Sequence, residues 1–157
     1  MFRLPARPEL IETFVHDLYK NAGIHTPADL CPRTVANLLG REIVCLPIDS
    51  VRIGNTVYVD CRLSESRQRE LLAHELAHTF FHRTNQLVQS EQETHMQELD
   101  AKLFAFYACV PTFMLAQLDL PADRYQATYV IARTFRVSGA FAAKRLTLHL
   151  RHQAVSA

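Results

Sequence analysis

Apolar residues recur at the helical period along most of this chain. Over positions 8–22 they stand at i, i+1, i+4, i+5, i+8 and i+9, which predicts an amphipathic helix that ends at Gly23. Thr26-Pro27 is a typical helix start, and the pattern continues to Gly40 with an interruption at Cys31-Pro32. We therefore predict two N-terminal helices, the second of them broken.

The pattern changes after Gly40 to short runs rich in valine and isoleucine. Such runs occupy positions 43–46, 51–53 and 57–59, and Gly54-Asn55 between the last two is typical of a turn. We predict three short strands in a small antiparallel sheet.

An uninterrupted helical stretch follows the last strand, without glycine or proline over positions 64–83. Ser64 is a suitable N-cap, and Leu72, Leu76 and Phe80 form an apolar stripe at i, i+4 and i+8. Positions 85–92 are polar and predict a loop. Further helices are expected over 94–109, 113–118 and 122–135, and from Ser138 onward.

These elements predict an α+β fold: a mostly helical single domain in which a small three-stranded antiparallel sheet precedes a central helix. We expect one domain over residues 1–157. Within it, 1–40 form N-terminal helices, 41–63 the sheet, 64–119 the helices of the candidate site and 120–157 a C-terminal helical segment that resembles a helix-turn-helix.

Composition excludes little but gives no sign of a membrane or nucleic-acid partner. Lysine and arginine total 17 and aspartate and glutamate 16, and 48% of the residues are hydrophobic. The chain shows neither a secretion signal nor an apolar run of about 20 residues, so we expect it in the cytoplasm. The four cysteines contain no C-x-x-C pair, and in a reducing compartment we expect them to be buried small side chains.

The candidate chemistry lies in the central helix, where His74, Glu75 and His78 form the pattern H-E-x-x-H. Residues four apart lie on one face of a helix, so both imidazoles can reach one ion. Glu75 points about 100° away from His74 and stands beside that ion, where it can act as a general base. This arrangement is typical of a zinc hydrolase, and Zn²⁺ is the expected cofactor.

A catalytic zinc ion takes three protein ligands, so one more is required. The downstream candidates are His82, Glu91, Glu93, His95, Glu98 and Asp100. Glu98 shares its side of the helix with Ala101, Ala105 and Ala108, and small residues let two helices approach closely. Asp100 points roughly the opposite way. We therefore favour Glu98 as the third ligand. His82 is the next candidate, and it could either bind the ion or lie beside the substrate.

Three blocks from Val57 onward form a recognisable pattern. The first is a strand that leads into RQRELLAHELAHTFFH. The second is ELDAKLFA, residues 98–105, followed by Pro111. The third is FRVS, residues 135–138, followed by KRL, residues 144–146. In these blocks the chain resembles the ImmA/IrrE family of H-E-x-x-H zinc peptidases. It departs from the family pattern at residues 108–110, where Ala-Cys-Val replaces the usual Leu-Leu-Met.

The resemblance implies that His74, His78 and Glu98 bind the metal and that Glu75 is the catalytic base. It also implies a site-specific endopeptidase that cleaves a helix-turn-helix repressor of the Xre or Cro/CI type and so derepresses mobile-element, phage or stress-response genes. We expect such a repressor as the partner. The replaced residues before Pro111 change packing and leave the ligand assignment intact.

A non-enzymatic alternative remains open: a repressor-binding or DNA-binding regulatory module in which the zinc site is structural or vestigial. The segment 129–150 resembles a helix-turn-helix with local positive charge at Arg133, Arg136, Lys144, Arg145 and Arg151. Few residues suited to reading bases lie on the presumed recognition helix, so DNA binding is possible but not favoured. If it occurs, Lys144 and Arg145 should contribute to it in a salt-dependent way.

Overall fold

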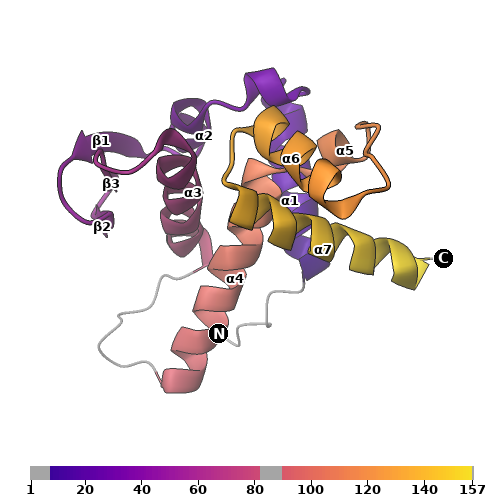
Figure 1. Cartoon of the computed structure of the whole chain (residues 1–157). Coiled ribbons are helices and arrows are strands. Elements are labelled where there is room, and N and C mark those ends of the chain that lie inside the picture. Colours follow the sequence, from indigo (N-terminus) through magenta and orange to yellow (C-terminus); the bar gives the residue numbers. More distant parts are fainter. Residues whose placement is uncertain (1–7, 82–89, 157) are drawn as a thin grey trace.

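The computed structural model of the chain describes residues 8–81 and 90–156 (Figure 1). Its elements in chain order are α1 (Pro8–Asn21), the 3-10 helix η1 (Pro27–Asp29), α2 (Pro32–Leu38), β1 (Glu42–Leu46), β2 (Val51–Ile53), β3 (Thr56–Asp60), α3 (Glu65–Phe81), α4 (Glu91–Cys109), α5 (Thr112–Leu115), α6 (Arg124–Phe135) and α7 (Gly139–Ser156). The predicted α+β class, mostly helical with one small sheet, is confirmed. No helix within the described ranges is long and apolar enough to cross a membrane.

The N-terminal helices agree with the hydrophobic pattern. After α1 the chain turns through Gly23, whose φ of 72° lies in the left-handed region that favours glycine. The expected break at Cys31-Pro32 separates η1 from α2, because a proline ring excludes a continuous helix at that point. Tyr19 fixes α1 to the centre of the molecule, where its buried hydroxyl donates to the carbonyl oxygen of Ala108 over 2.7 Å.

The sheet has the order β1-β3-β2 and is mixed, so the prediction of an antiparallel sheet was wrong for one pair. β2 pairs antiparallel with β3 through the turn at Gly54-Asn55, but β1 pairs parallel with β3. β3 carries the two buried valines, Val57 and Val59, and therefore takes the middle position. Because the chain reverses direction twice between β1 and β3, these two neighbours run the same way.

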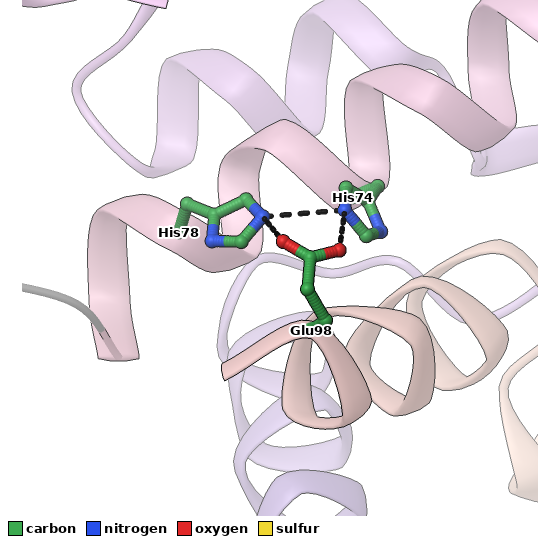
Figure 2. Close-up of side chains that lie close together, drawn as sticks. All are labelled: His74, His78 and Glu98. Carbon is green, nitrogen blue, oxygen red and sulfur yellow. Dashed lines mark hydrogen bonds and ion pairs between the residues drawn. The ribbon is translucent and has the colours of Figure 1, made fainter. Parts of the chain in front are cut away.

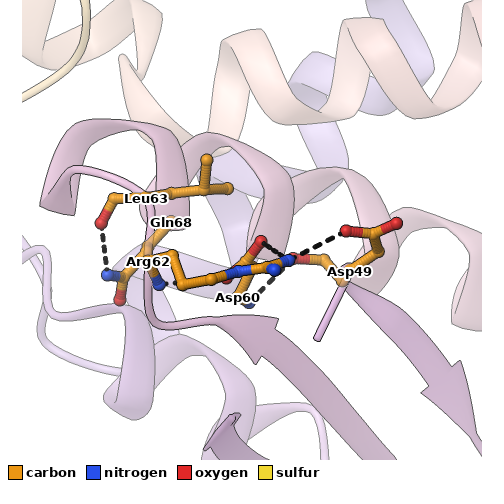
Figure 3. Close-up of polar contacts among 6 residues, drawn as sticks. Asp49, Asp60, Arg62, Leu63 and Gln68 are labelled. Carbon is orange, nitrogen blue, oxygen red and sulfur yellow. Dashed lines mark hydrogen bonds and ion pairs between the residues drawn. The ribbon is translucent and has the colours of Figure 1, made fainter. Parts of the chain in front are cut away.

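A group of polar contacts connects β3 to α3 (Figure 3). Arg62 donates to both carboxylate oxygens of Asp60, each over 2.8 Å, and to Asp49 over 3.0 Å. The Gln68 amide, in the first turns of α3, donates to the carbonyl oxygen of Leu63 over 2.7 Å. These bonds satisfy backbone and carboxylate groups at the turn and hold the start of α3 against the end of the sheet.

Helix α4 begins earlier than the periodicity predicts. Ser90 is its N-cap, and Ser90 and Glu93 form a capping box in which each side chain accepts from the other residue's backbone N–H. The expected loop over 85–92 was therefore wrong at positions 91 and 92, which are helical, while positions 82–89 lie outside the described residues. The capping box is the sequence signal that places this start.

The α3–α4 pair occupies the centre, with the sheet on one side and the C-terminal helices on the other (Figure 1). Both helices bury alanines, whose small side chains let helix axes approach closely. The fully or nearly buried members are Ala73, Ala77, Ala101, Ala105 and Ala108. Cys109 is buried as expected, whereas Cys31, Cys45 and Cys61 are exposed, so the expectation of four buried cysteines was wrong.

The C-terminal helices α6 and α7 are held against α3 by a buried carboxylate. Glu70 of α3 accepts the backbone N–H of Ser138 over 2.7 Å, and its other oxygen accepts from Arg67 over 2.7 Å. Between the two helices Arg136 adopts a left-handed conformation with φ of 55°, which allows the sharp turn. The expected helix pair with a short connection is therefore present.

Candidate metal centre

Helix α3 presents His74 and His78 on one face, one turn apart, as the spacing predicts (Figure 2). Their Nε2 atoms lie 3.2 Å apart, and the ring centroids lie 4.9 Å apart with the ring planes at 73°. The buried residues Leu72 and Leu76 of the same helix face the core and fix its rotation. Both imidazoles consequently converge on one point at the side of α3 that faces α4.

Glu98 reaches this point from α4, between the two rings (Figure 2). One carboxylate oxygen lies 3.2 Å from Nε2 of His74 and the other lies 3.3 Å from Nε2 of His78. The small side chains at Ala101 and Ala105 permit this approach, because larger ones would hold the two helices apart. The structure thus brings together the three residues that the sequence analysis selected as metal ligands.

The donor set fits a zinc ion in chemistry and in spacing. Two imidazole nitrogens and a carboxylate oxygen are ligands that zinc accepts. Bonds of about 2.0–2.1 Å at tetrahedral angles place two ligand atoms about 3.3 Å apart. The observed separations of 3.2, 3.2 and 3.3 Å agree with that spacing. The same set also suits other divalent transition metals.

Burial prepares the histidines for metal binding. The side chains of His74 and His78 are 21% and 13% exposed. Removal from water lowers the pKa of both imidazoles below the ordinary value, although the neighbouring Glu98 carboxylate acts in the opposite direction. Both rings are therefore neutral near pH 7, which is the state that coordinates a metal.

Glu75 lies beside the three candidate ligands and is itself half-buried. Burial raises the pKa of its carboxyl, the charge of Arg52 lowers it and the charge of Glu98 raises it. A carboxylate whose pKa is raised is a better proton acceptor than a solvated one. This environment suits the general base that the H-E-x-x-H pattern predicts.

The other ligand candidates lie elsewhere or serve other roles. Asp100 is buried at 2% exposure, and Glu93 belongs to the capping box of α4. Glu91 and His95 are exposed on α4. His82 lies outside the described residues. Among the side chains that the structure describes, only His74, His78 and Glu98 form a three-residue group with the spacing of a metal site.

Two cations near the site did not emerge from the sequence. The charge of Arg52, on β2, acts on Glu75 and His78, and the charge of Lys102, on α4, acts on His74. Lys102 lies four residues after Glu98, so helical spacing alone could have indicated it. The position of Arg52 depends on the order of the strands, which the sequence pattern does not specify.

The helix-turn-helix resemblance does not extend to all of its basic residues. Arg145 is 1% exposed, and its guanidinium donates to the carbonyl oxygen of Val110 over 3.0 Å and to the hydroxyl of Thr112 over 2.8 Å. Its charge also lies over the ring of Tyr107, 5.1 Å from the centroid. The suggestion that Arg145 contributes to a DNA-binding surface was therefore wrong, because the side chain connects α7 to the core.

Comparison with known proteins agrees with this arrangement. Residues 37–147 match a peptidase family described as the IrrE N-terminal-like domain, and this range includes all four site residues. The chain is similar to the "Phage-like element PBSX protein XkdA" of Bacillus subtilis (strain 168), with 32% identity over 92% of this chain and 75% of that protein. It is also similar to the uncharacterized protein YqaB of the same strain, with 27% identity over 90% of this chain and 84% of that protein.

Proposed function

Because this chain belongs to the peptidase family described as the IrrE N-terminal-like domain, we propose that it is a zinc-dependent, site-specific endopeptidase whose substrate is a helix-turn-helix transcriptional repressor. The observation that carries the proposal is the triangle of His74, His78 and Glu98 with Glu75 beside it. A peptidase family match and a donor set that fits zinc point to the same reaction.

In this proposal His74 and His78 of α3 and Glu98 of α4 hold the zinc ion. When bound, zinc acts as a Lewis acid that polarises a carbonyl group and makes water more acidic. The two imidazoles are neutral and partly buried, so they contribute lone pairs and not charge. Glu98 supplies the one negative charge of the donor set, which leaves the loaded site electropositive toward a carbonyl oxygen.

Glu75 moves the proton. Its carboxylate accepts a proton from the attacking water and later donates it to the amine that leaves when the peptide bond breaks. Burial favours this role because it raises the pKa of the carboxyl. Its position next to His74 in sequence places it near the reacting atoms without placing it among the three ligands.

The substrate class is inferred from the family resemblance and from the relatives. One relative is named as a protein of a phage-like element, which agrees with the mobile-element or phage genes that the family resemblance implies. A protease that cuts such a repressor at one bond would switch those genes on.

The first experiment measures metal content and cleavage together. Protein purified without chelator would be analysed for zinc as wild type, Glu98→Ala, Glu75→Gln and Glu91→Gln. We expect about one zinc per chain in the wild type, loss of most of it in Glu98→Ala and retention in Glu75→Gln. Glu91→Gln, an exposed acid on the same helix, is the matched control and should keep zinc.

Cleavage is then tested on purified repressors encoded near the gene for this chain. Glu75→Gln should lower kcat by a factor of at least about 1000 while zinc remains, because removal of the base removes the path for the proton. Cleavage that persists in Glu75→Gln would contradict the mechanism. A wild type that binds no zinc after reconstitution would support the non-catalytic alternative instead.

A further inference from the structure

During peptide hydrolysis the carbonyl oxygen becomes negatively charged, and hydrogen-bond donors aimed at that oxygen stabilise the charge in addition to the metal ion. Such a donor is inferred here on the basis of the proposed function. In that proposal His74, His78 and Glu98 bind the ion and Glu75 transfers the proton. A further donor would come from another element that borders the site.

The register of the sheet decides which side chain of β2 faces the helices. Arg52 of β2 stands directly opposite Val57 of β3. Directly opposite residues of an antiparallel pair project from the same face of the sheet. Val57 is completely buried, and β3 packs on α3. Arg52 therefore projects from the face that is turned toward α3.

The exposure of its neighbours agrees with this orientation. Val51 and Ile53 are 40% and 63% exposed, whereas Arg52 between them is half-buried. Because β2 is an edge strand, no further strand of the described sheet lies between Arg52 and the solvent beside it. A bound peptide chain can reach this position without any rearrangement of the sheet.

From its position on β2, the charge of Arg52 reaches the part of α3 that carries Glu75 and His78. The charge of Arg52 acts on both the carboxylate of Glu75 and the imidazole of His78, so its guanidinium lies within electrostatic range of both side chains. Lys102 acts on His74 alone and is exposed at the end of a flexible side chain. Arg52 is thus the cation that strand β2 holds near Glu75, the proposed general base.

We propose that Arg52 is a catalytic residue that donates hydrogen bonds to the carbonyl oxygen of the scissile peptide. Water loses a proton to Glu75 as its oxygen forms a bond to the carbonyl carbon, and the electron pair of the C=O double bond moves to the carbonyl oxygen. The guanidinium stabilises that charge. When the C=O bond forms again the C–N bond breaks, and Glu75 returns the proton to the departing amine.

An arginine suits this role for two reasons. A guanidinium group carries a positive charge that can offset the developing negative charge, and it presents several N–H groups in one plane. A strand also holds the base of the side chain in place, so little reorganisation is needed when charge develops. A lysine at the same position would keep the charge but would offer a single, more mobile ammonium group.

The test uses the zinc-loaded full chain as wild type, Arg52→Gln, Arg52→Lys and the control Lys102→Gln, which removes the other cation near the site. Zinc content and Tm are measured first. Binding of N-phosphoryl-leucine amide is then measured by calorimetry, since its tetrahedral anionic phosphoryl group stands in for the attacked carbonyl. We expect affinity about 100-fold lower in Arg52→Gln, about 10-fold lower in Arg52→Lys and unchanged within about 3-fold in Lys102→Gln.

Affinity in Arg52→Gln within about 3-fold of the wild type, with zinc retained, would overturn the assignment. So would a zinc-loaded wild type that does not bind the phosphoryl compound. A wild type that takes up no zinc would instead overturn the proposed function, and this assignment with it. If Arg52→Gln does not fold, the comparison of Arg52→Lys with the wild type decides, since an equal affinity would contradict the proposed role of the guanidinium group.

Discussion

At the scale of single residues, the candidate site depends on how burial changes the proton affinity of His74 and His78. Water stabilises a charged imidazolium, and removal from water lowers the pKa of both rings below the ordinary value of 6.5. Each ring therefore stays neutral to a lower pH than an exposed histidine. The protein does not have to displace protons from these rings when it binds a metal at neutral pH.

This direction predicts the pH dependence of metal binding. Zinc affinity should change little between about pH 8 and 6.5 and then fall as the rings protonate, by up to about 100-fold per pH unit because two protons compete with the ion. Competition with a fluorescent zinc chelator at fixed ionic strength would measure it. A steep fall already between pH 8 and 7 would contradict neutral, buried rings.

The same two rings affect the stability of the metal-free chain. Because their folded pKa values lie below the unfolded value, the unfolded chain binds more protons in the interval between the two values. Stability is therefore fully present above the unfolded value and is lost as the pH falls through that interval. This loss is separate from the loss of bound metal.

The chemistry of individual residues was the part of the site most open to prediction. His74, Glu75 and His78 follow from the helical repeat, since residues four apart share a face in any α-helix. Glu98 followed from a strip of small residues on its own helix. Whether these side chains bind zinc and move a proton remains a prediction that the experiments above test.

At the scale of secondary-structure elements, the distance between α3 and α4 controls the site. Ala101 is completely buried one turn after Glu98, on the helix that packs against α3. A larger side chain there would push the two helices apart and carry Glu98 away from the histidines. The alanines are therefore a condition for the metal centre as well as for packing.

Ala101→Leu should lower the free energy of unfolding by about 1–3 kcal/mol, as overpacking in a closed interface usually does. It should also weaken zinc affinity by at least about 10-fold, because one of three ligands is displaced. Urea unfolding and zinc competition would measure the two effects. Ala154→Leu, at an exposed position of α7, is the control and should change neither. Zinc affinity equal to the wild type in Ala101→Leu would show that helix separation does not limit the site.

The order of the strands could not be predicted at this scale. The runs at 43–46, 51–53 and 57–59 were recognised, and the turn at Gly54-Asn55 correctly indicated an antiparallel hairpin. The pattern does not say whether β1 pairs with β2 or with β3. That choice depends on which strand buries its valines most completely, and Val57 and Val59 place β3 in the middle.

At the scale of the whole molecule, buried polar contacts connect the C-terminal helices to the rest. Arg145 joins α7 to the end of α4 and the start of α5 through Val110 and Thr112. Burial lowers the pKa of its guanidinium to about 10, so the side chain still carries its charge at neutral pH. A buried charge of this kind depends on its hydrogen-bond partners, because loss of a partner leaves a buried polar group unsatisfied.

Arg145→Ala should therefore lower the free energy of unfolding by about 2–4 kcal/mol, since it leaves a cavity and removes the donors to Val110 and Thr112. The neighbouring Lys144 is exposed, and Lys144→Ala should change the free energy of unfolding by less than about 0.5 kcal/mol. Urea unfolding of both variants would test this. Equal stability of the two variants would contradict a structural role for Arg145 and would reopen the question of a basic binding surface.

The sequence by itself determined the features that depend on near neighbours in the chain. The helices follow the hydrophobic period, the breaks follow glycine and proline, and the pairing of His74 with His78 follows the pitch of a helix. The family could be recognised from the same local patterns. These features can be predicted from the sequence because the residues involved lie within one or two helical turns of one another.

Only the tertiary structure decided how distant parts of the chain meet. It placed Glu98 of α4 between the two rings, put Arg52 on the face of the sheet that packs on α3, and buried Arg145 instead of exposing it. Each outcome depends on which apolar surfaces cover one another, and that is a property of the whole core. No period along the chain encodes it, because many pairings of the same elements satisfy the same local pattern.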